Sequence, residues 1–258
     1  MLITARDLVI QSFLLYKKHW KLMFQFLGLL FIPYSVLGVL GSIIKPVVSQ
    51  SSSSLVSAGF GVGYTVLVVI ASIIGFWISI ALTKAIAEIY RNEKEQPKTS
   101  EELADAKPFV WPAILAIVLG ALAIIGGFLL LIIPGVILAL WFIFSIEAVI
   151  LDGRKSPKEA LKASRELSRG RFWAVLWRLV APWIVFGLIA FIPQQLLKIM
   201  LVLIKQNIAL GSFEYFISMN ALQILLIIVS LLLTPLTVCA KTILYLELRD
   251  TQLPKLKK

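Results

Sequence analysis

The sequence predicts an all-α, polytopic integral membrane protein with about six transmembrane helices and short amphipathic interfacial helices. Of its 258 residues, 59% are hydrophobic, and the mean hydropathy of the chain is +0.93. Both values are typical of membrane proteins and exclude an ordinary soluble domain. Uncharged runs long enough to cross a hydrocarbon core of about 30 Å cover residues 22–44, 46–83, 108–146, 179–197 and 215–240.

We interpret residues 1–258 as a single membrane domain. The predicted spans cover about residues 20–44, 59–82, 109–133, 136–151, 172–192 and 216–238. Three polar segments carry helix-start signatures, in which Ser or Thr stands three residues before an acidic residue: Thr4 with Asp7, Thr99 with Glu102, and Ser156 with Glu159. These signatures predict interfacial helices at about 5–18, 100–106 and 157–169.

The chain can be divided into three units, each with a capped polar helix, a tryptophan and two spans. Two explanations are open. The units are an internal triplication, or any helix that re-enters the bilayer favours a cap and an interfacial tryptophan.

Proline and glycine residues predict where the helices end. Pro134-Gly135 is expected to end the third span and turn the chain. The fourth span, 136–151, would then hold 16 residues and reach about 24 Å, which is short for the bilayer. Gly170 is expected to end the 157–169 helix, and Pro193 is expected to break the helix of the fifth span.

The distribution of basic residues predicts the topology. With both termini placed in the cytoplasm, all but three of the 25 Lys and Arg residues lie on the inner side, and the three are Lys45, Lys198 and Lys205. This asymmetry follows the positive-inside rule. The net charge of +11 is also found in nucleic-acid-binding proteins, but the basic residues flank the apolar runs. We therefore expect no nucleic-acid partner.

The predicted 157–169 helix has two distinct faces. Its small and apolar residues share one face, and a basic row spaced by 4, 3 and 4 residues lies on another: Lys158, Lys162, Arg165 and Arg169. In one interpretation the row contacts anionic lipid headgroups at the inner face of the membrane. In the other it is a solvated face, with Glu159 and Glu166 pairing internally.

The region from Leu131 to Trp173 resembles one bacterial membrane family. The resemblance rests on Ile133-Pro134-Gly135, Asp152-Gly153, Glu159-Ala160-Leu161, Ser164, Leu167, Gly170 and Phe172-Trp173. It is similar to the membrane domain of glycerophosphoryl diester phosphodiesterases and to related six-helix proteins of unknown function. The resemblance implies a multi-pass protein of the bacterial cytoplasmic membrane. In some relatives a soluble phosphodiesterase domain follows this one, but the present sequence contains none, so we expect no such activity.

Glu147 is the acidic residue that falls inside a predicted span. Charge within a membrane is costly, which makes such a residue a candidate functional group. Its position near the inner end of the span also permits a structural pairing or contact with headgroups. We expect Arg178, on the next span, to be its partner.

A row of small residues marks one side of the third span. Ala113, Ala116, Gly120, Ala123 and Gly127 recur at intervals of 3, 4, 3 and 4 residues. Small residues let membrane helices approach closely, and a 3.5-residue period keeps one seam against a partner helix. We expect this seam to be buried, with the fourth span as its nearest candidate partner.

The chemistry of the sequence favours a binding module. It contains none of the nucleophile-elbow, metalloprotease or phosphate-loop motifs, and its single Cys and single His exclude an intrachain disulfide and a multi-histidine metal site. We expect no cofactor. The sequence predicts a non-enzymatic module that binds membrane lipids or a membrane protein partner through its inner-face helices. The alternative is a small-solute transporter or channel, which requires polar residues converging at mid-membrane; the sequence indicates no such cluster.

Overall fold

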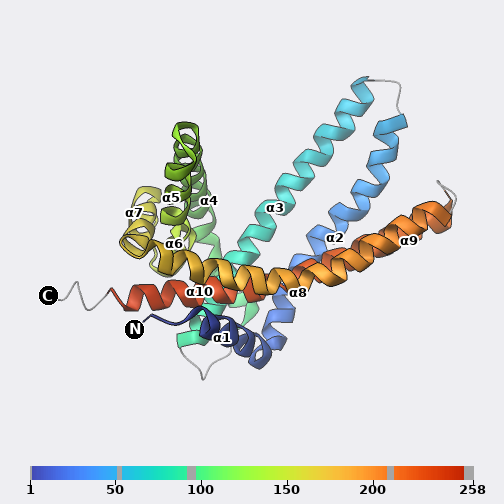
Figure 1. Cartoon of the computed structure of the whole chain (residues 1–258). Coiled ribbons are helices and arrows are strands. Elements are labelled where there is room, and N and C mark those ends of the chain that lie inside the picture. Colours follow the sequence, from blue (N-terminus) through green and yellow to red (C-terminus); the bar gives the residue numbers. More distant parts are fainter. Residues whose placement is uncertain (1, 51–53, 92–96, 208–211, 253–258) are drawn as a thin grey trace.

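The computed structural model describes residues 2–50, 54–91, 97–207 and 212–252, which form ten helices and no strand (Figure 1). The helices are α1 Ala5–Lys18, α2 Trp20–Gln50, α3 Ser54–Arg91, α4 Thr99–Leu130, α5 Ile132–Phe142, α6 Ser145–Leu151, α7 Pro157–Ser168, α8 Phe172–Asn207, α9 Phe213–Leu232 and α10 Thr234–Asp250. Six helical stretches in these residues are long and apolar enough to cross a membrane, counting α5 with α6 and α9 with α10 as one stretch each. The polytopic helical class is therefore confirmed.

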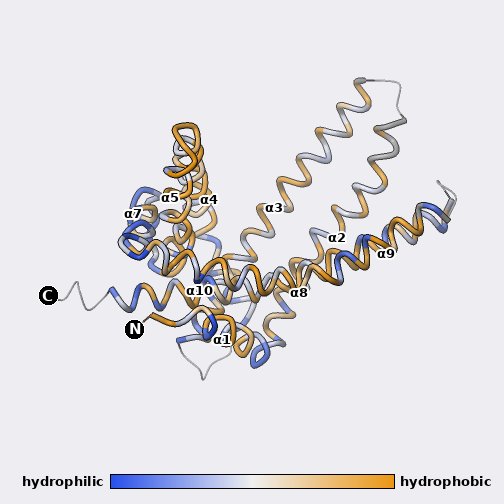
Figure 2. The backbone as a smooth tube through the Cα atoms, viewed as in Figure 1, coloured by the Kyte–Doolittle hydropathy of each residue, from blue (hydrophilic) through white to orange (hydrophobic). Residues whose placement is uncertain are grey.

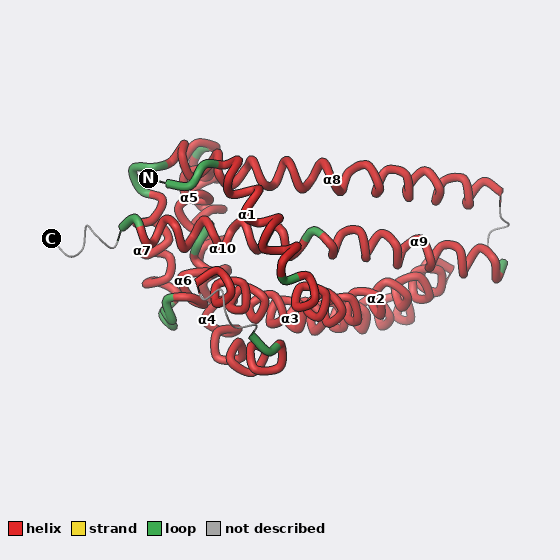
Figure 3. The backbone as a smooth tube through the Cα atoms, turned by 90° about the horizontal axis from the view of Figure 1, so that it is seen from below, coloured by secondary structure: helices red, strands yellow, loops and turns green. Residues whose placement is uncertain are grey.

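Three helical hairpins, α2–α3, α4–α5 and α8–α9, diverge from a common base (Figure 1). The base is formed by α1, α6, α7 and α10, with α1 packed on α8 and α10, and α10 packed on α3. Viewed from below, α8 and α9 run beside each other, and α9 runs beside α2 (Figure 3). Polar residues concentrate on α1, α7 and the base and at the outer tip of α8–α9, while the hairpins are mostly apolar (Figure 2). Because α1 packs on α10, the two helices lie together at the base of the molecule (Figure 1).

The hairpin turn between α4 and α5 lies earlier than Pro134-Gly135, so that prediction was wrong. The chain turns at Leu131, whose backbone is extended with φ −164° and ψ 157°. Pro134 is tolerated in the first turn of α5 because the N–H groups there have no intrahelical partner. The stretch Ile132–Leu151 consequently has 20 residues and reaches about 30 Å, which matches the hydrocarbon core.

Two further expected breaks are absent from the structure. The predicted 100–106 helix is the beginning of α4, and α8 continues through both Pro182 and Pro193. A proline removes one backbone hydrogen bond, whereas ending a helix inside lipid would leave several groups unpaired. The interruptions occur instead between α5 and α6 at Ile143–Phe144, and at Leu233 between α9 and α10.

The helix-start signatures have mixed outcomes. The Thr4 side chain accepts a hydrogen bond from the Asp7 N–H and caps α1 as predicted. Ser156 occupies the N-cap position of α7, but its side chain forms no capping hydrogen bond with a described residue. Lys98 holds the N-cap position of α4, and Thr99 is the first helical residue, whose hydroxyl donates to Gln25 Oε1 at 2.6 Å. The predicted capping role of Thr99 was therefore wrong.

Two glycines end helices at the base. Gly170 follows α7 with φ +75°, and Gly153 follows α6 with φ +66°. This left-handed conformation is readily adopted by glycine and costly for other residues. The predicted end of the 157–169 helix at Gly170 is therefore confirmed.

Candidate functional site

A groove lies between α5, α8 and α10, and a buried charge lies beside it. Its volume is about 380 Å³. Apolar side chains from all three helices line it, among them Val136, Ala139, Ile143, Leu176, Leu179, Trp183 and Ala240. Such a lining suits a hydrocarbon chain, because it offers few hydrogen-bonding partners to a polar ligand.

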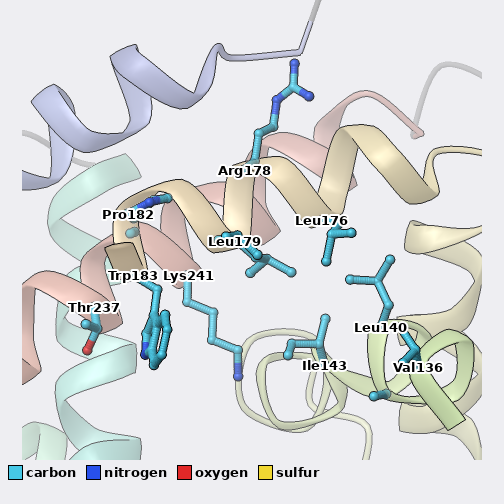
Figure 4. A pocket seen from close by; sticks show the side chains of 13 residues that line it. Val136, Leu140, Ile143, Leu176, Arg178, Leu179, Pro182, Trp183, Thr237 and Lys241 are labelled. Carbon is cyan, nitrogen blue, oxygen red and sulfur yellow. The ribbon is translucent and has the colours of Figure 1, made fainter. Parts of the chain in front are cut away.

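The side chain of Lys241 extends into this groove from α10, between Trp183 and Ile143 (Figure 4). Its Nζ atom lies 2.9 Å from Glu147 Oε1, and the side chains of Lys241 and Glu147 are 30% and 6% exposed. The second carboxylate oxygen, Glu147 Oε2, is buried and has no hydrogen-bond partner among the described residues. The groove is thus an apolar surface with one ammonium group, held in place by a buried carboxylate.

The expected pairing of Glu147 with Arg178 was wrong. Arg178 donates hydrogen bonds to the backbone oxygens of Ile3 and Ala174. Figure 4 shows its guanidinium directed away from the groove, toward the N-terminal segment. Sequence reasoning missed Lys241, although it is the only basic residue between Lys205 and Arg249. That isolation within a long apolar segment was the signal that could have identified it.

The predicted seam of α4 is largely buried, and its two glycines lie against α5 and α7. Ala113, Ala116, Gly120 and Gly127 are buried and Ala123 is half-buried, whereas the large neighbours Leu115, Leu119 and Leu122 are exposed. A Cβ atom added to Gly127 would lie 3.1 Å from the Cα atom of Gly135. At Gly120 the nearest atom would be Leu161 Cδ2, at 3.3 Å. The absence of side chains at these positions lets the helices of the hairpin approach closely.

The helix α7 packs its apolar face on α4, α5 and α6. Ser164 joins α7 to the break between α5 and α6, because its hydroxyl donates to the Trp141 oxygen and accepts from the Phe144 N–H. Ser168 donates similarly to the Leu140 oxygen at 3.1 Å. These serines satisfy backbone groups that the interrupted helix leaves unpaired.

The basic row of α7 faces away from the bundle. Lys158, Lys162, Arg165 and Arg169 are all exposed. The guanidinium carbon of Arg165 lies 4.4 Å from the centre of the Trp141 ring, a cation–π contact. Neither Glu159 nor Glu166 forms an ion pair with any described residue. The row is therefore not neutralised from within α7.

Asp152 anchors α10 to the loop after α6. Its carboxylate accepts hydrogen bonds from Tyr245 Oη at 2.8 Å and from Arg249 Nη1 at 2.9 Å. Two hydrogen bonds continue the attachment at the end of α10: Arg171 donates to Thr251, and Gln252 donates to the Glu166 backbone oxygen. This polar network fixes the helix that carries Lys241.

Residues 114–257 match the family described as the membrane domain of glycerophosphoryl diester phosphodiesterase. The chain belongs to this family. No curated protein and no solved structure matches it. Within this membrane-domain family member, the residues that carried the resemblance have structural roles: Gly135 permits close helix packing, Asp152 anchors α10, and Ser164 bridges a helix break.

Proposed function

We propose that this protein is a non-enzymatic membrane module that holds phospholipid at the inner face of the bacterial cytoplasmic membrane. The observation that carries the proposal is the apolar groove with Lys241 at its wall. An acyl chain fits the apolar lining, and the ammonium group favours the phosphate or ester oxygens that follow the chain. Membership of a membrane-domain family supports the general class of membrane module.

The basic row of α7 supports lipid binding independently of the groove. Its four exposed cations are attached to a helix whose opposite face is buried in the protein. Near an anionic membrane surface each Lys or Arg contributes about 1 kcal/mol of attraction, which salt weakens. The row would therefore concentrate anionic headgroups beside the base of the molecule.

Replacing Lys158, Lys162, Arg165 and Arg169 by Gln should reduce the anionic phospholipid that co-purifies with the protein in mild detergent. Lipid mass spectrometry per mole of protein is the measurement. The matched control keeps each charge by exchanging Lys for Arg and Arg for Lys, and should retain lipid like the wild type. Equal lipid content in the Gln variant would favour a solvated face without a lipid role.

We propose a topology with both termini in the cytoplasm. The excess of Lys and Arg at the base supports it, as does the position of α1 beside α10. Reporters fused after Ser52 and after Lys258, positions outside the described residues, should report opposite sides of the membrane. A cytoplasmic signal from the fusion after Ser52 would contradict this topology.

A solute transporter is the second candidate function, and the buried Glu147–Lys241 pair is the observation that favours it. If Glu147 and Lys241 bound an ion or solute during transport, their charges would be required for it. Neutralising both residues together should then abolish solute flux in reconstituted vesicles. In the proposed lipid module, the same double substitution should leave a phospholipid chain in the groove.

A further inference from the structure

A second cavity lies where α2, α3, α9 and α10 meet, away from the groove beside Lys241. Its volume is about 430 Å³, which is within the range of about 300–1,000 Å³ for small-ligand sites. Five uncharged polar side chains line it, and they come from all four helices: Tyr34, Ser79, Gln223, Ser230 and Thr234.

Ser230 is already paired, because its hydroxyl donates to the Leu226 oxygen and accepts from Gln194 Nε2. The side chains of the other four residues, Tyr34, Ser79, Gln223 and Thr234, have no hydrogen-bond partner among the described residues. Other hydroxyls on the membrane helices satisfy themselves by donating to a backbone oxygen four residues earlier, as Thr65, Ser72 and Thr83 do. In a membrane-spanning segment an unpartnered polar group is costly. The four unpartnered side chains at this cavity are therefore available to bind a ligand.

The Gln223 amide has space because α2 carries glycine opposite to it. A Cβ atom built on Gly38 would lie 2.9 Å from Gln223 Nε2. The amide, which carries both donors and an acceptor, thus lies directly against the backbone of α2 at the wall of the cavity. Tyr34 is 39% exposed, so the cavity is accessible from the lipid side of the hairpins.

No charged side chain lines the cavity among the residues that the structure describes, and its apolar walls are leucine and isoleucine. A charged headgroup would lose its hydration there without gaining a counter-ion. A neutral group with hydroxyls would satisfy the free donors and acceptors, and its attached chains would extend into the bilayer. We propose that this cavity binds the headgroup of a neutral, hydroxyl-bearing lipid of the diacylglycerol type.

The test measures binding of 1,2-dioleoylglycerol to the purified full-length protein by thermal shift and native mass spectrometry. Dioleoylphosphatidylglycerol supplies the same chains with a charged headgroup, and glycerol supplies the hydroxyls without chains. We expect dioleoylglycerol to bind at least tenfold more tightly than either. No binding of dioleoylglycerol would mean that water alone occupies the cavity and would overturn the proposal. Equal affinity for the charged lipid or for glycerol would overturn it as well.

Gln223→Met and, separately, Ser79→Ala should each weaken dioleoylglycerol binding by about fivefold, the effect of one hydrogen bond. Both should leave the ligand-free protein as stable as the wild type or more so, because each removes an unpartnered polar group. Ser72→Ala is the matched control on α3, since its hydroxyl is already bonded to the Val68 oxygen. Undiminished binding in both cavity variants would contradict the assignment, as would weakening of the same size in Ser72→Ala.

Discussion

Gly127→Ala should lower the thermal stability of the protein in detergent, whereas Gly126→Ala, one residue away, should leave it unchanged or raise it. At Gly127 the added carbon would lie 2.8 Å from Leu138 Cδ1 and 3.1 Å from the Gly135 backbone. Backbone atoms cannot move aside without separating α4 from α5, and overpacking of this kind costs about 1–3 kcal/mol. At Gly126 no atom of the described residues, apart from the helix's own backbone and the two neighbouring residues, would lie within 4 Å of the added carbon. Alanine is also a better helix former than glycine.

The measurement is a pair of melting curves in the same detergent, followed by tryptophan fluorescence or by loss of the monodisperse peak after heating. Gly126→Ala controls for the substitution itself, because it adds the same methyl group to the same helix. Equal melting temperatures for the two variants would show that α4 does not pack on α5 through this seam.

Lys241→Met should destabilise the protein by about 3 kcal/mol, which is typical when a buried ion pair loses one partner. The substitution leaves Glu147, whose side chain is 6% exposed, without its counter-ion and still enclosed by the bundle. Glu147→Leu should cost less, because the side chain of Lys241 is 30% exposed and long enough to turn toward the headgroups.

The double variant Glu147→Leu with Lys241→Met should recover most of the stability lost by Lys241→Met, since it leaves no unpaired charge. Thermal stabilities of the four proteins form a double-mutant cycle. A double variant whose loss equals the sum of the two single losses would mean that the two charges do not interact in the folded protein.

The features predictable from sequence were those that local chemistry determines. The length of the apolar segments predicted the membrane class. The end of α7 was predictable because Gly170 readily adopts the left-handed conformation that it has in the structure. The turn at Leu131 could not be located, because Pro134 and Gly135 have other roles there. Proline is acceptable in the first turn of α5. Gly135 leaves room for the ring of Phe128, because a Cβ atom added to Gly135 would lie only 2.5 Å from that ring.

The candidate sites depend on contacts between distant segments, and the sequence alone could not establish these. Glu147 was identified as unusual, but its partner Lys241 lies 94 residues later on a helix whose direction depends on the break at Leu233. The neutral cavity was missed altogether, because its polar side chains come from four separate helices. Each of those residues is unremarkable in its own helix, and only the fold brings them together.

The proposed function requires a phospholipid chain in the groove between α5, α8 and α10. Ala139→Trp would fill the groove from α5, while Ala121→Trp adds the same ring at an exposed position of α4. The direct measurement is the number of phospholipid molecules retained per protein after purification in mild detergent. We expect Ala139→Trp to retain at least one phospholipid fewer than the wild type and Ala121→Trp. Equal phospholipid content in all three proteins would contradict it.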